Sequence, residues 1–293
     1  MVLSIIEKAL DTWEEWNGSP GLSRQDVFAE DQERSPAAPV PPFINADTKP
    51  SRQIELDLDR LRGLGIIHPQ SPHTAIAEEY RRIKQPLLQK MGTEASQRST
   101  RFNLIMVTSA IAGEGKTFTA LNLAISMAME RDRTVLLIDA DMIKRGLSRL
   151  INIDSYKGLA DLLHDGQTAL GDVLLRTNLG NLNVLPVGEQ VAHYTELVGS
   201  SAMRRLTQQL ALRYPERIII FDTPPLFGVS AASVLANLMD QIVMVVEARK
   251  TPRDLIQEAM LLLGESKPIG VVLNKTAKTS RAKYVKYYTS GQA

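Results

Sequence analysis

The residues best suited to chemistry are the small, glycine-bearing run SAIAGEGKT at positions 109–117. It fits the phosphate-loop pattern GxxxxGK[ST], except that Ala110 replaces the first glycine. Its glycines let the main chain approach a polyphosphate closely, and successive N–H groups at the start of a helix can then surround the anion. Lys116 would reach the β and γ phosphates, and the Thr117 hydroxyl would bind Mg²⁺. The residues expected to contact the nucleotide here are Gly113, Glu114, Gly115, Lys116, Thr117 and Phe118.

Three aspartates follow apolar runs elsewhere in the chain. Asp139 and Asp141 end the run VLLIDAD, and Asp222 lies in IIIFDTPP. Aspartates at the ends of parallel strands can hold Mg²⁺ beside a phosphoryl group during its transfer. Of the pair at 139 and 141, one could serve the metal and the other could orient or accept the proton of an attacking hydroxyl or water. The alternative for each aspartate is a helix N-cap.

A further candidate ends the apolar run GVVLN. The side chain of Asn274 combines a donor with an acceptor and could therefore recognise the edge of a purine. The guanine-reading pattern NKxD would need an aspartate at position 277, where this chain has Ala277. The sequence therefore favours adenine over guanine. The alternative for Asn274 is a structural turn, in which asparagine is common.

The elements that must position these groups alternate along the chain. An apolar strand precedes the run 109–117 and an apolar-faced helix follows it, as a phosphate loop requires, whereas the alternative is an ordinary glycine-rich turn before a core helix. The apolar runs and their alternation with helices predict a doubly wound, mostly parallel α/β sheet with ligands at the carboxyl ends of the strands. Strands are predicted at 103–108, 134–139, 182–186, 217–222, 241–247 and 270–274. Helices are predicted at 117–130, 144–151, 158–164, 202–214, 230–238 and 252–265.

Four regions are predicted along the chain. Residues 1–16 have apolar positions at helical spacing and predict a short amphipathic helix. Residues 17–70 include the proline-rich stretch SPAAPVPPF and are expected to be a disordered linker. Residues 71–276 would form the phosphate-loop domain, and residues 277–293 a flexible, tyrosine-bearing tail.

The phosphate-loop domain is expected to begin with an amphipathic helix over 71–90. On its polar side, Glu78, Arg81 and Lys84 recur every third residue. The simplest interpretation is a solvated face with local ion pairs.

The composition excludes several classes of protein. The 293 residues carry a net charge of only +1, so no global field favours nucleic acid as a partner. The absence of cysteine excludes disulfides and thiolate chemistry. No apolar run approaches the roughly 20 residues that span a bilayer. We therefore expect a soluble, cytoplasmic protein that does not bind nucleic acid.

Taken together, AGEGKT, LLIDAD, IIIFDTPPL and GVVLN resemble the bacterial tyrosine kinases of exopolysaccharide and capsule synthesis. These kinases belong to the deviant P-loop NTPases, with the septum-site and plasmid-partition ATPases. Those ATPases carry a lysine early in the loop, where this chain has Ile111, which favours the kinase branch. The opening SIIEKAL is similar to the start of stand-alone members that work beside exosortase-linked polysaccharide systems.

The resemblance implies roles for residues of this chain. Lys116 and Thr117 would bind ATP and Mg²⁺, Asp139 and Asp222 would complete the metal site, and Asp141 would help to activate a tyrosine hydroxyl. An arginine that the family carries shortly after the second aspartate is displaced here, because Ile143 occupies its position.

The resemblance also implies self-assembly. In the family, a helix with an ExxRxxR motif builds a ring, and here Glu78, Arg81 and Lys84 occupy that motif. A C-terminal tyrosine cluster enters the active site of a neighbouring subunit in the family. The corresponding residues, expected to be autophosphorylated here, are Tyr284, Tyr287 and Tyr288.

These expectations amount to an ATP- and Mg²⁺-dependent protein-tyrosine autokinase that phosphorylates its own tail in trans and controls polysaccharide synthesis or export. The implied partners are other copies of the chain, a membrane-embedded polysaccharide co-polymerase that activates it at the inner face of the membrane, and a cognate tyrosine phosphatase. One alternative is a P-loop ATPase switch that positions a partner without phosphorylating tyrosine. Another is an inactive scaffold that binds nucleotide without turnover.

Overall fold

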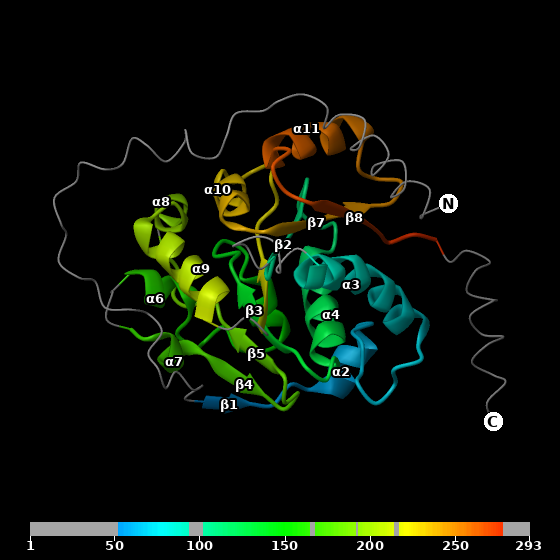
Figure 1. The fold of residues 1–293 in the computed structure, drawn as a ribbon, viewed down its shortest axis with the longest axis horizontal. Helices are drawn as coiled ribbons and strands as arrows, with labels where there is room; N and C mark the ends of the chain where they lie inside the picture. The colour runs from blue at the N-terminus through cyan, green and yellow to red at the C-terminus, as the bar shows by residue number, and fades with distance from the viewer. Residues whose placement is uncertain (1–51, 94–101, 165–167, 192, 214–216, 278–293) are drawn as a thin grey trace. The chain divides into compact units, whose positions relative to one another are not determined.

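A single twisted sheet organises the computed structural model, which describes residues 52–93, 102–164, 168–191, 193–213 and 217–277 (Figure 1). Within these ranges the strands follow the order β1-β4-β5-β3-β6-β2-β7-β8. All neighbouring strands pair in parallel except β4 and β5, which are antiparallel. The strands are β1 (Arg52–Ile54), β2 (Leu104–Ser109), β3 (Thr134–Asp139), β4 (Leu175–Thr177), β5 (Leu182–Leu185), β6 (Arg217–Asp222), β7 (Gln241–Glu247) and β8 (Ile269–Asn274).

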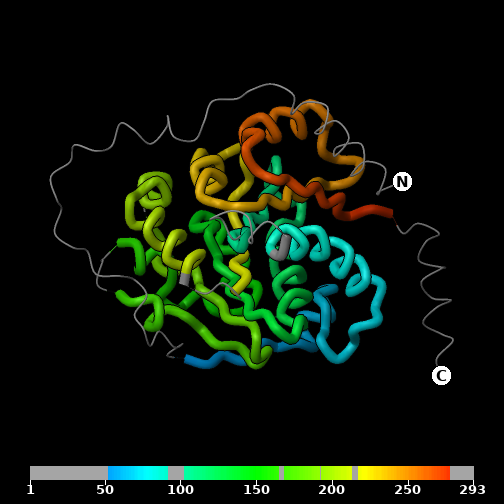
Figure 2. The backbone as a smooth tube through the Cα atoms, viewed as in Figure 1, coloured from blue at the N-terminus to red at the C-terminus, as the bar shows by residue number. Residues whose placement is uncertain are grey.

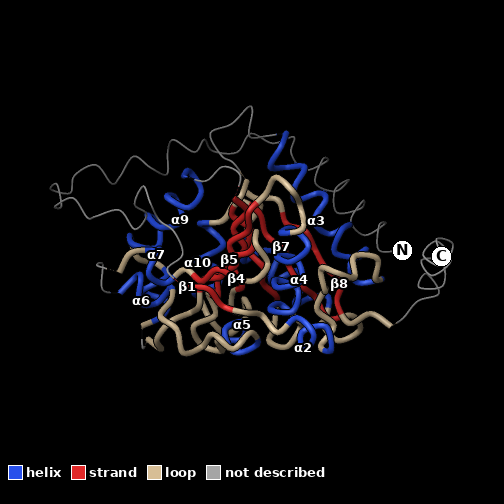
Figure 3. Tube along the Cα trace, turned by 90° about the horizontal axis from the view of Figure 1, so that it is seen from below, coloured by secondary structure: helices blue, strands red, loops and turns tan. Residues whose placement is uncertain are grey.

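Helices cover both faces of this sheet (Figure 3). They are α2 (Leu58–Gly63), α3 (Ala75–Thr93), α4 (Lys116–Ala128), α5 (Gly146–Leu150), α6 (Leu159–His164), α7 (Leu170–Val173), α8 (Tyr194–Val198), α9 (Ser201–Arg213), α10 (Ala231–Leu238) and α11 (Arg253–Leu263). Successive residues of a central strand serve opposite faces: Ile105 joins the core under α3 and α4, whereas Met106 joins the core under α9 and α10. The predicted doubly wound, mostly parallel sheet is confirmed. No helix in the described ranges is long and apolar enough to cross a membrane.

The six predicted strands are present, each within one residue of the expected bounds. Strands β1 and β4 were not predicted. Each has only three residues, RQI and LRT, and two of the three are polar in both. Such short segments give too little periodicity to separate a strand from a loop.

The expected linker over 17–70 is wrong for its last part, because residues 52–67 fold onto the domain. Strand β1 pairs with β4, about 120 residues away in the sequence, as the blue segment beside the green one shows in Figure 2. The Asn178 side chain donates to and accepts from the main chain of Leu56, and Asn122 Oδ1 accepts from Ile67 N at 2.8 Å. The side chains of Leu56, Leu61 and Ile67 are buried. The predicted helix over 1–16 and linker residues 17–51 lie outside the described residues.

The polar side of α3, formed by Glu78, Arg81 and Lys84, is only partly exposed to solvent. Arg81 pairs with Glu78 at the partly exposed surface, as expected. Lys84 differs, because it is buried, and its ammonium donates to Ser126 O at 2.7 Å and lies 2.6 Å from Glu130 Oε1. The last carbonyls of a helix attract cations, so the long lysine stem lies over α4 and its charge binds the C-terminal end of that helix. The prediction of a solvated face is therefore wrong at Lys84.

This contact predicts that Lys84 and Arg81 of α3 contribute differently to the free energy of unfolding. Lys84→Met should lower the free energy of unfolding by about 1–3 kcal/mol, because it leaves a buried carbonyl without its charged donor. Arg81→Met should cost no more than about 0.5 kcal/mol, since it removes a partly exposed pair. Urea unfolding of the two variants measures both values, and equal losses would contradict the assignment.

Candidate active site

The loop between β2 and α4 has the backbone of an anion-binding site. Gly113 and Gly115 adopt φ values of +92° and +100°, which L-residues with a Cβ rarely adopt. A Cβ added at Gly115 would lie 2.0 Å from Asn274 Nδ2, so the loop also has no space for one. Lys116 then begins α4 directly, and the free N–H groups of the first helical turn face the loop. The predicted strand, loop and helix are confirmed.

Two of the residues expected to contact ATP point their side chains into the protein instead. Glu114 is fully buried, and its carboxylate accepts from Ile111 N at 2.8 Å, from Glu247 N at 3.2 Å and from the Thr251 hydroxyl. The ring of Phe118 is half-buried beside Gly65 and packs against the core under α3 and α4. Only the main chain of these two residues is left to face a phosphate.

The aspartates of β3 and β6 stand side by side. Asp139 and Asp222 are partners in the parallel register, so their side chains leave the sheet at the same edge and on the same face. Asp139 Oδ2 accepts from the Ser148 main-chain N–H at 2.8 Å and from its hydroxyl at 2.7 Å. Burial raises the pKa of Asp139 to about 6, although the bonds from Ser148 oppose the shift.

Asp222 is buried at the end of β6, and the described part of the chain gives its carboxylate few donors. Neither of its carboxylate oxygens has a hydrogen-bond partner of ordinary geometry among the described residues. Burial, and then the nearby charge of Asp139, raise the pKa of Asp222 well above its usual value, while the Thr117 hydroxyl and Lys116 oppose the shift. A buried, unpartnered carboxylate is costly unless a cation binds it.

Lys116 lies among these carboxylates. Burial lowers the pKa of Lys116, and the charges of Asp222 and Asp141 act in the opposite direction. Asp222 and Asp141 therefore lie near one buried ammonium, with Asp139 beside Asp222, and this excess of negative charge suits a divalent cation. Within the described ranges no three acidic, histidine or cysteine side chains form a metal site by themselves. Mg²⁺ needs no such cage, since it is usually held by one or two carboxylates, water and substrate phosphates. The residues present fit a nucleotide-bound Mg²⁺.

Asn274 is already engaged with the phosphate loop. Its Nδ2 donates to Glu114 O at 2.8 Å, and its Oδ1 accepts from Lys275 N at 2.8 Å. The structural role that the sequence left open is therefore present. A purine would have to use the second amide hydrogen and the remaining lone pair of the oxygen.

Comparisons with known proteins agree with this geometry. The family model described as an AAA domain matches residues 102–258. Tyrosine-protein kinase YwqD of Bacillus subtilis is 30% identical over 226 residues, which are 76% of this chain and 91% of YwqD. The chain belongs to the bacterial tyrosine-protein kinase family. A solved structure of the kinase domain of the Escherichia coli tyrosine kinase ETK is 28% identical, with a TM-score of 0.61, over 73% of this chain and 83% of that domain.

A longer relative of this kinase carries a different name. Succinoglycan biosynthesis transport protein ExoP of Rhizobium meliloti is 32% identical over 221 residues, which are 73% of this chain but 27% of ExoP. The family match covers Lys116 and the three aspartates of the site. It does not reach Glu78, Asn274 or the tail.

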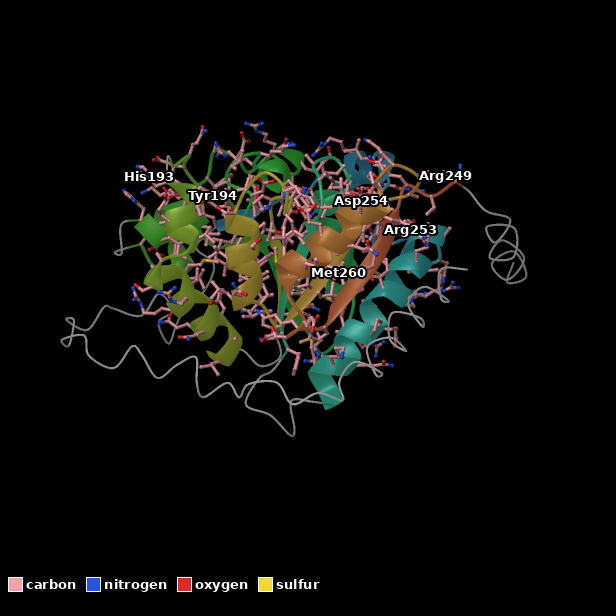
Figure 4. The ribbon with its side chains drawn as sticks, turned by 90° about the horizontal axis from the view of Figure 1, so that it is seen from above. His193, Tyr194, Arg249, Arg253, Asp254 and Met260 are labelled. Carbon is pink, nitrogen blue, oxygen red and sulfur yellow. The ribbon has the colours of Figure 1, made fainter. Side chains whose placement is uncertain are left out.

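The kinase site contains two residues that the sequence did not single out. Ser148 holds Asp139, and the buried Tyr194 donates its hydroxyl proton to Ala140 O at 2.5 Å. Burial, and then the charges of the three aspartates, raise the pKa of Tyr194, so its hydroxyl keeps its proton. Figure 4 labels Tyr194 at the start of α8. Neither residue lies in a motif, and only the fold brings them to the aspartates.

The displaced arginine of the family motif is not replaced by the next arginine of the chain. Arg145 adopts a φ of +53°, and its guanidinium donates to Asp154 O at 2.5 Å and to Gly188 O at 2.9 Å. These contacts direct the Arg145 side chain to neighbouring loops. Ile143 is 52% exposed in the same turn.

The bond from Tyr194 predicts a measurable cost. Tyr194→Phe should lower the free energy of unfolding by about 1–2 kcal/mol, because Ala140 O loses its donor in a buried setting. Tyr156→Phe is the matched control and should change stability by no more than about 0.5 kcal/mol, since that ring is partly exposed. Urea unfolding measures both values. If Tyr194→Phe has the same free energy of unfolding as the wild type, the assigned bond is refuted.

Proposed function

We propose that this member of the tyrosine-kinase family uses ATP to phosphorylate Tyr284, Tyr287 or Tyr288 in a neighbouring copy of itself. The observation that carries the proposal is the register of β3 and β6, which puts Asp139 beside Asp222 next to Lys116. The names of the relatives, tyrosine-protein kinases, support tyrosine as the acceptor. The tail tyrosines themselves lie outside the described residues.

The proposed roles of the residues combine their positions with the resemblance to the family. The main-chain N–H groups of 113–117 would bind the phosphates, and Lys116 would balance negative charge on the γ phosphoryl group during transfer. The phenolic oxygen would attack the γ phosphorus as the bond to the β–γ bridging oxygen breaks, and Asp141 would accept the phenolic proton. Thr117, Asp139 and Asp222 would hold Mg²⁺, which when bound neutralises charge on the transferring group.

Charge supports the tail as a substrate of this site. The tail carries Lys278, Lys283 and Lys286, which complement a cluster of three aspartates. Each phosphorylation would add nearly two negative charges and so oppose a second docking. Modification of the tail would in this way weaken contacts between copies.

The wider role of the kinase is also part of the proposal. The name of ExoP, a succinoglycan biosynthesis transport protein, supports a function in polysaccharide synthesis or export. The family resemblance alone supports a membrane-embedded co-polymerase as activator and a cognate phosphatase as antagonist. The kinase would then act at the inner face of the membrane. Assembly into a ring would use Glu78 and Arg81 of α3, because Lys84 is engaged with α4 of its own chain.

The test is phosphopeptide mapping. The protein is incubated with ATP and Mg²⁺, and phosphotyrosine is located by mass spectrometry in the wild type and in a variant with phenylalanine at 284, 287 and 288. Phosphate on these tyrosines, and none on the variant, is the expected result. ATP hydrolysis without phosphotyrosine would favour an ATPase switch, and nucleotide binding without turnover would favour an inactive scaffold.

A further inference from the structure

The carbonyl groups of the phosphate loop have their own donors. When the N–H groups of such a loop face a phosphate, its C=O groups point the other way and need partners. The side chain of Lys275 donates to Gly113 O at 2.8 Å, and Asn274 Nδ2 donates to Glu114 O at 2.8 Å. Both donors come from the end of β8, about 160 residues further along the chain.

Lys275 is fixed by a second contact at the end of the neighbouring strand. Its ammonium lies 2.9 Å from Glu247 Oε2, and this bond is the main reason why the pKa of Glu247 is lowered. Glu247 also donates its main-chain N–H to the carboxylate of Glu114. The ends of β7 and β8 therefore hold the loop through the main-chain carbonyls of Gly113 and Glu114 and through the Glu114 carboxylate.

The backbone at Lys275 is unusual for a lysine. Its φ is +54°, in the left-handed region, and its N–H donates to Asn274 Oδ1 at 2.8 Å. A residue other than glycine persists in this region only where its surroundings hold it there, and such residues cluster at functional sites. Here the residue with this conformation is the one whose ammonium contacts the phosphate loop.

We propose that Lys275 is a positioning residue for nucleotide binding, which holds the Gly113 carbonyl so that the N–H groups of the loop face the phosphates. The proposal rests on the nucleotide site of the proposed function. Lys275 would not contact the phosphates itself and would act only through the conformation of the loop. It also joins the loop to the part of the chain from which the tyrosine-bearing tail continues.

The position of Lys275 has a reciprocal consequence. If its contacts favour the binding shape of the loop, bound nucleotide must stabilise those contacts by the same free energy. Nucleotide should therefore slow amide hydrogen exchange at residues 274–277 in the wild type. The same protection should be reduced in a variant that lacks the ammonium.

The chain offers a matched control. Lys250 also pairs with Glu247 Oε2, at 3.3 Å, and follows the same strand β7. Within the described residues its ammonium bonds to Glu247 and not to the phosphate loop. Lys250→Met thus removes one positive charge from the same carboxylate without removing a donor from Gly113. Figure 4 marks this turn by its neighbour Arg249.

Two variants of Lys275 separate positioning from stability. Lys275→Met removes the ammonium and keeps the backbone strain. Lys275→Gly removes the ammonium and relieves the strain, because glycine adopts a positive φ without cost. The midpoint of urea unfolding for Lys275→Gly should therefore not fall below that of Lys275→Met, whereas both variants should bind nucleotide more weakly.

The experiment measures the dissociation constant of a fluorescent ADP analogue with Mg²⁺ for the full chain. We expect both Lys275 variants to bind about fivefold more weakly, as loss of a charge-assisted bond at a half-exposed site allows. Lys250→Met should stay within about twofold of the wild type. Wild-type affinity in both Lys275 variants would overturn the positioning role, and Lys275→Gly decides the question if Lys275→Met does not fold. A wild type that binds no ADP would instead overturn the proposed nucleotide site.

Discussion

Lys116→Met is expected to reduce tyrosine phosphorylation by about 10³-fold. Lys116 begins α4, and its buried ammonium interacts with the negative charges of Asp222 and Asp141. Its charge would be needed most when negative charge is redistributed over the transferring phosphoryl group. Methionine keeps the length and apolar stem of lysine, so the packing of α4 against the sheet should be retained.

A mixing experiment uses this variant to test transfer between copies. Full-length Lys116→Met, which keeps its tail tyrosines, is incubated with active chain that has phenylalanine at 284, 287 and 288. Neither protein alone should gain phosphotyrosine on the tail, and the mixture should place it on the Lys116→Met chain. No signal in the mixture, when the wild type alone gives one, would contradict transfer in trans. Tail phosphorylation of Lys116→Met alone at the wild-type rate would contradict the role of the lysine.

The parts of the site that could be predicted from the sequence are those that neighbouring residues determine. The loop glycines, Lys116 and the strand-end aspartates lie in short motifs whose chemistry follows from residue type and spacing. The apolar strands that end at Asp139 and Asp222 also fix which edge of a parallel sheet these side chains occupy. That is why the central geometry follows from local patterns.

The remaining parts depend on contacts between distant segments. Tyr194 reaches Ala140 from α8, and Lys275 reaches Gly113 from the end of β8. No local spacing indicates either contact. The sequence predicts Glu114 as an ATP contact, but the main-chain N–H groups of Ile111 and Glu247 satisfy its buried carboxylate. Sequence patterns predict which residues lie at a strand end, and packing decides which of them face a ligand.

The same limit explains the error at Lys84. A lysine three residues after an arginine on a helix predicts a second exposed cation, and the sequence cannot show that the C-terminal end of α4 lies within reach. The match to the AAA domain model gives no information on Lys84, because the matched residues begin at 102. Any model of a ring built on α3 must account for a lysine that is engaged within its own chain.

Asp222→Asn is expected to have opposite effects on activity and stability. Activity should fall by about 10²–10³-fold, because an amide cannot supply the negative charge that a cation needs beside the phosphates. Stability should rise by about 1–2 kcal/mol, since burial and the nearby charge of Asp139 outweigh the support from the Thr117 hydroxyl and Lys116, so that burial of the carboxylate as an anion is unfavourable. A cost of this kind is common where a site is arranged for function instead of stability.

The neighbouring aspartate provides the control for Asp222→Asn. Asp139 accepts bonds from the Ser148 N–H and hydroxyl and from the Asp141 N–H. Asp139→Asn would put an amide into this set of donors, and it should therefore lose activity and stability together. Urea unfolding and phosphotyrosine assays on both variants measure the four values. If Asp222→Asn is destabilised as much as Asp139→Asn, the two carboxylates have the same structural role, and Asp222 is not the unpartnered ligand that a nucleotide-bound cation would complete.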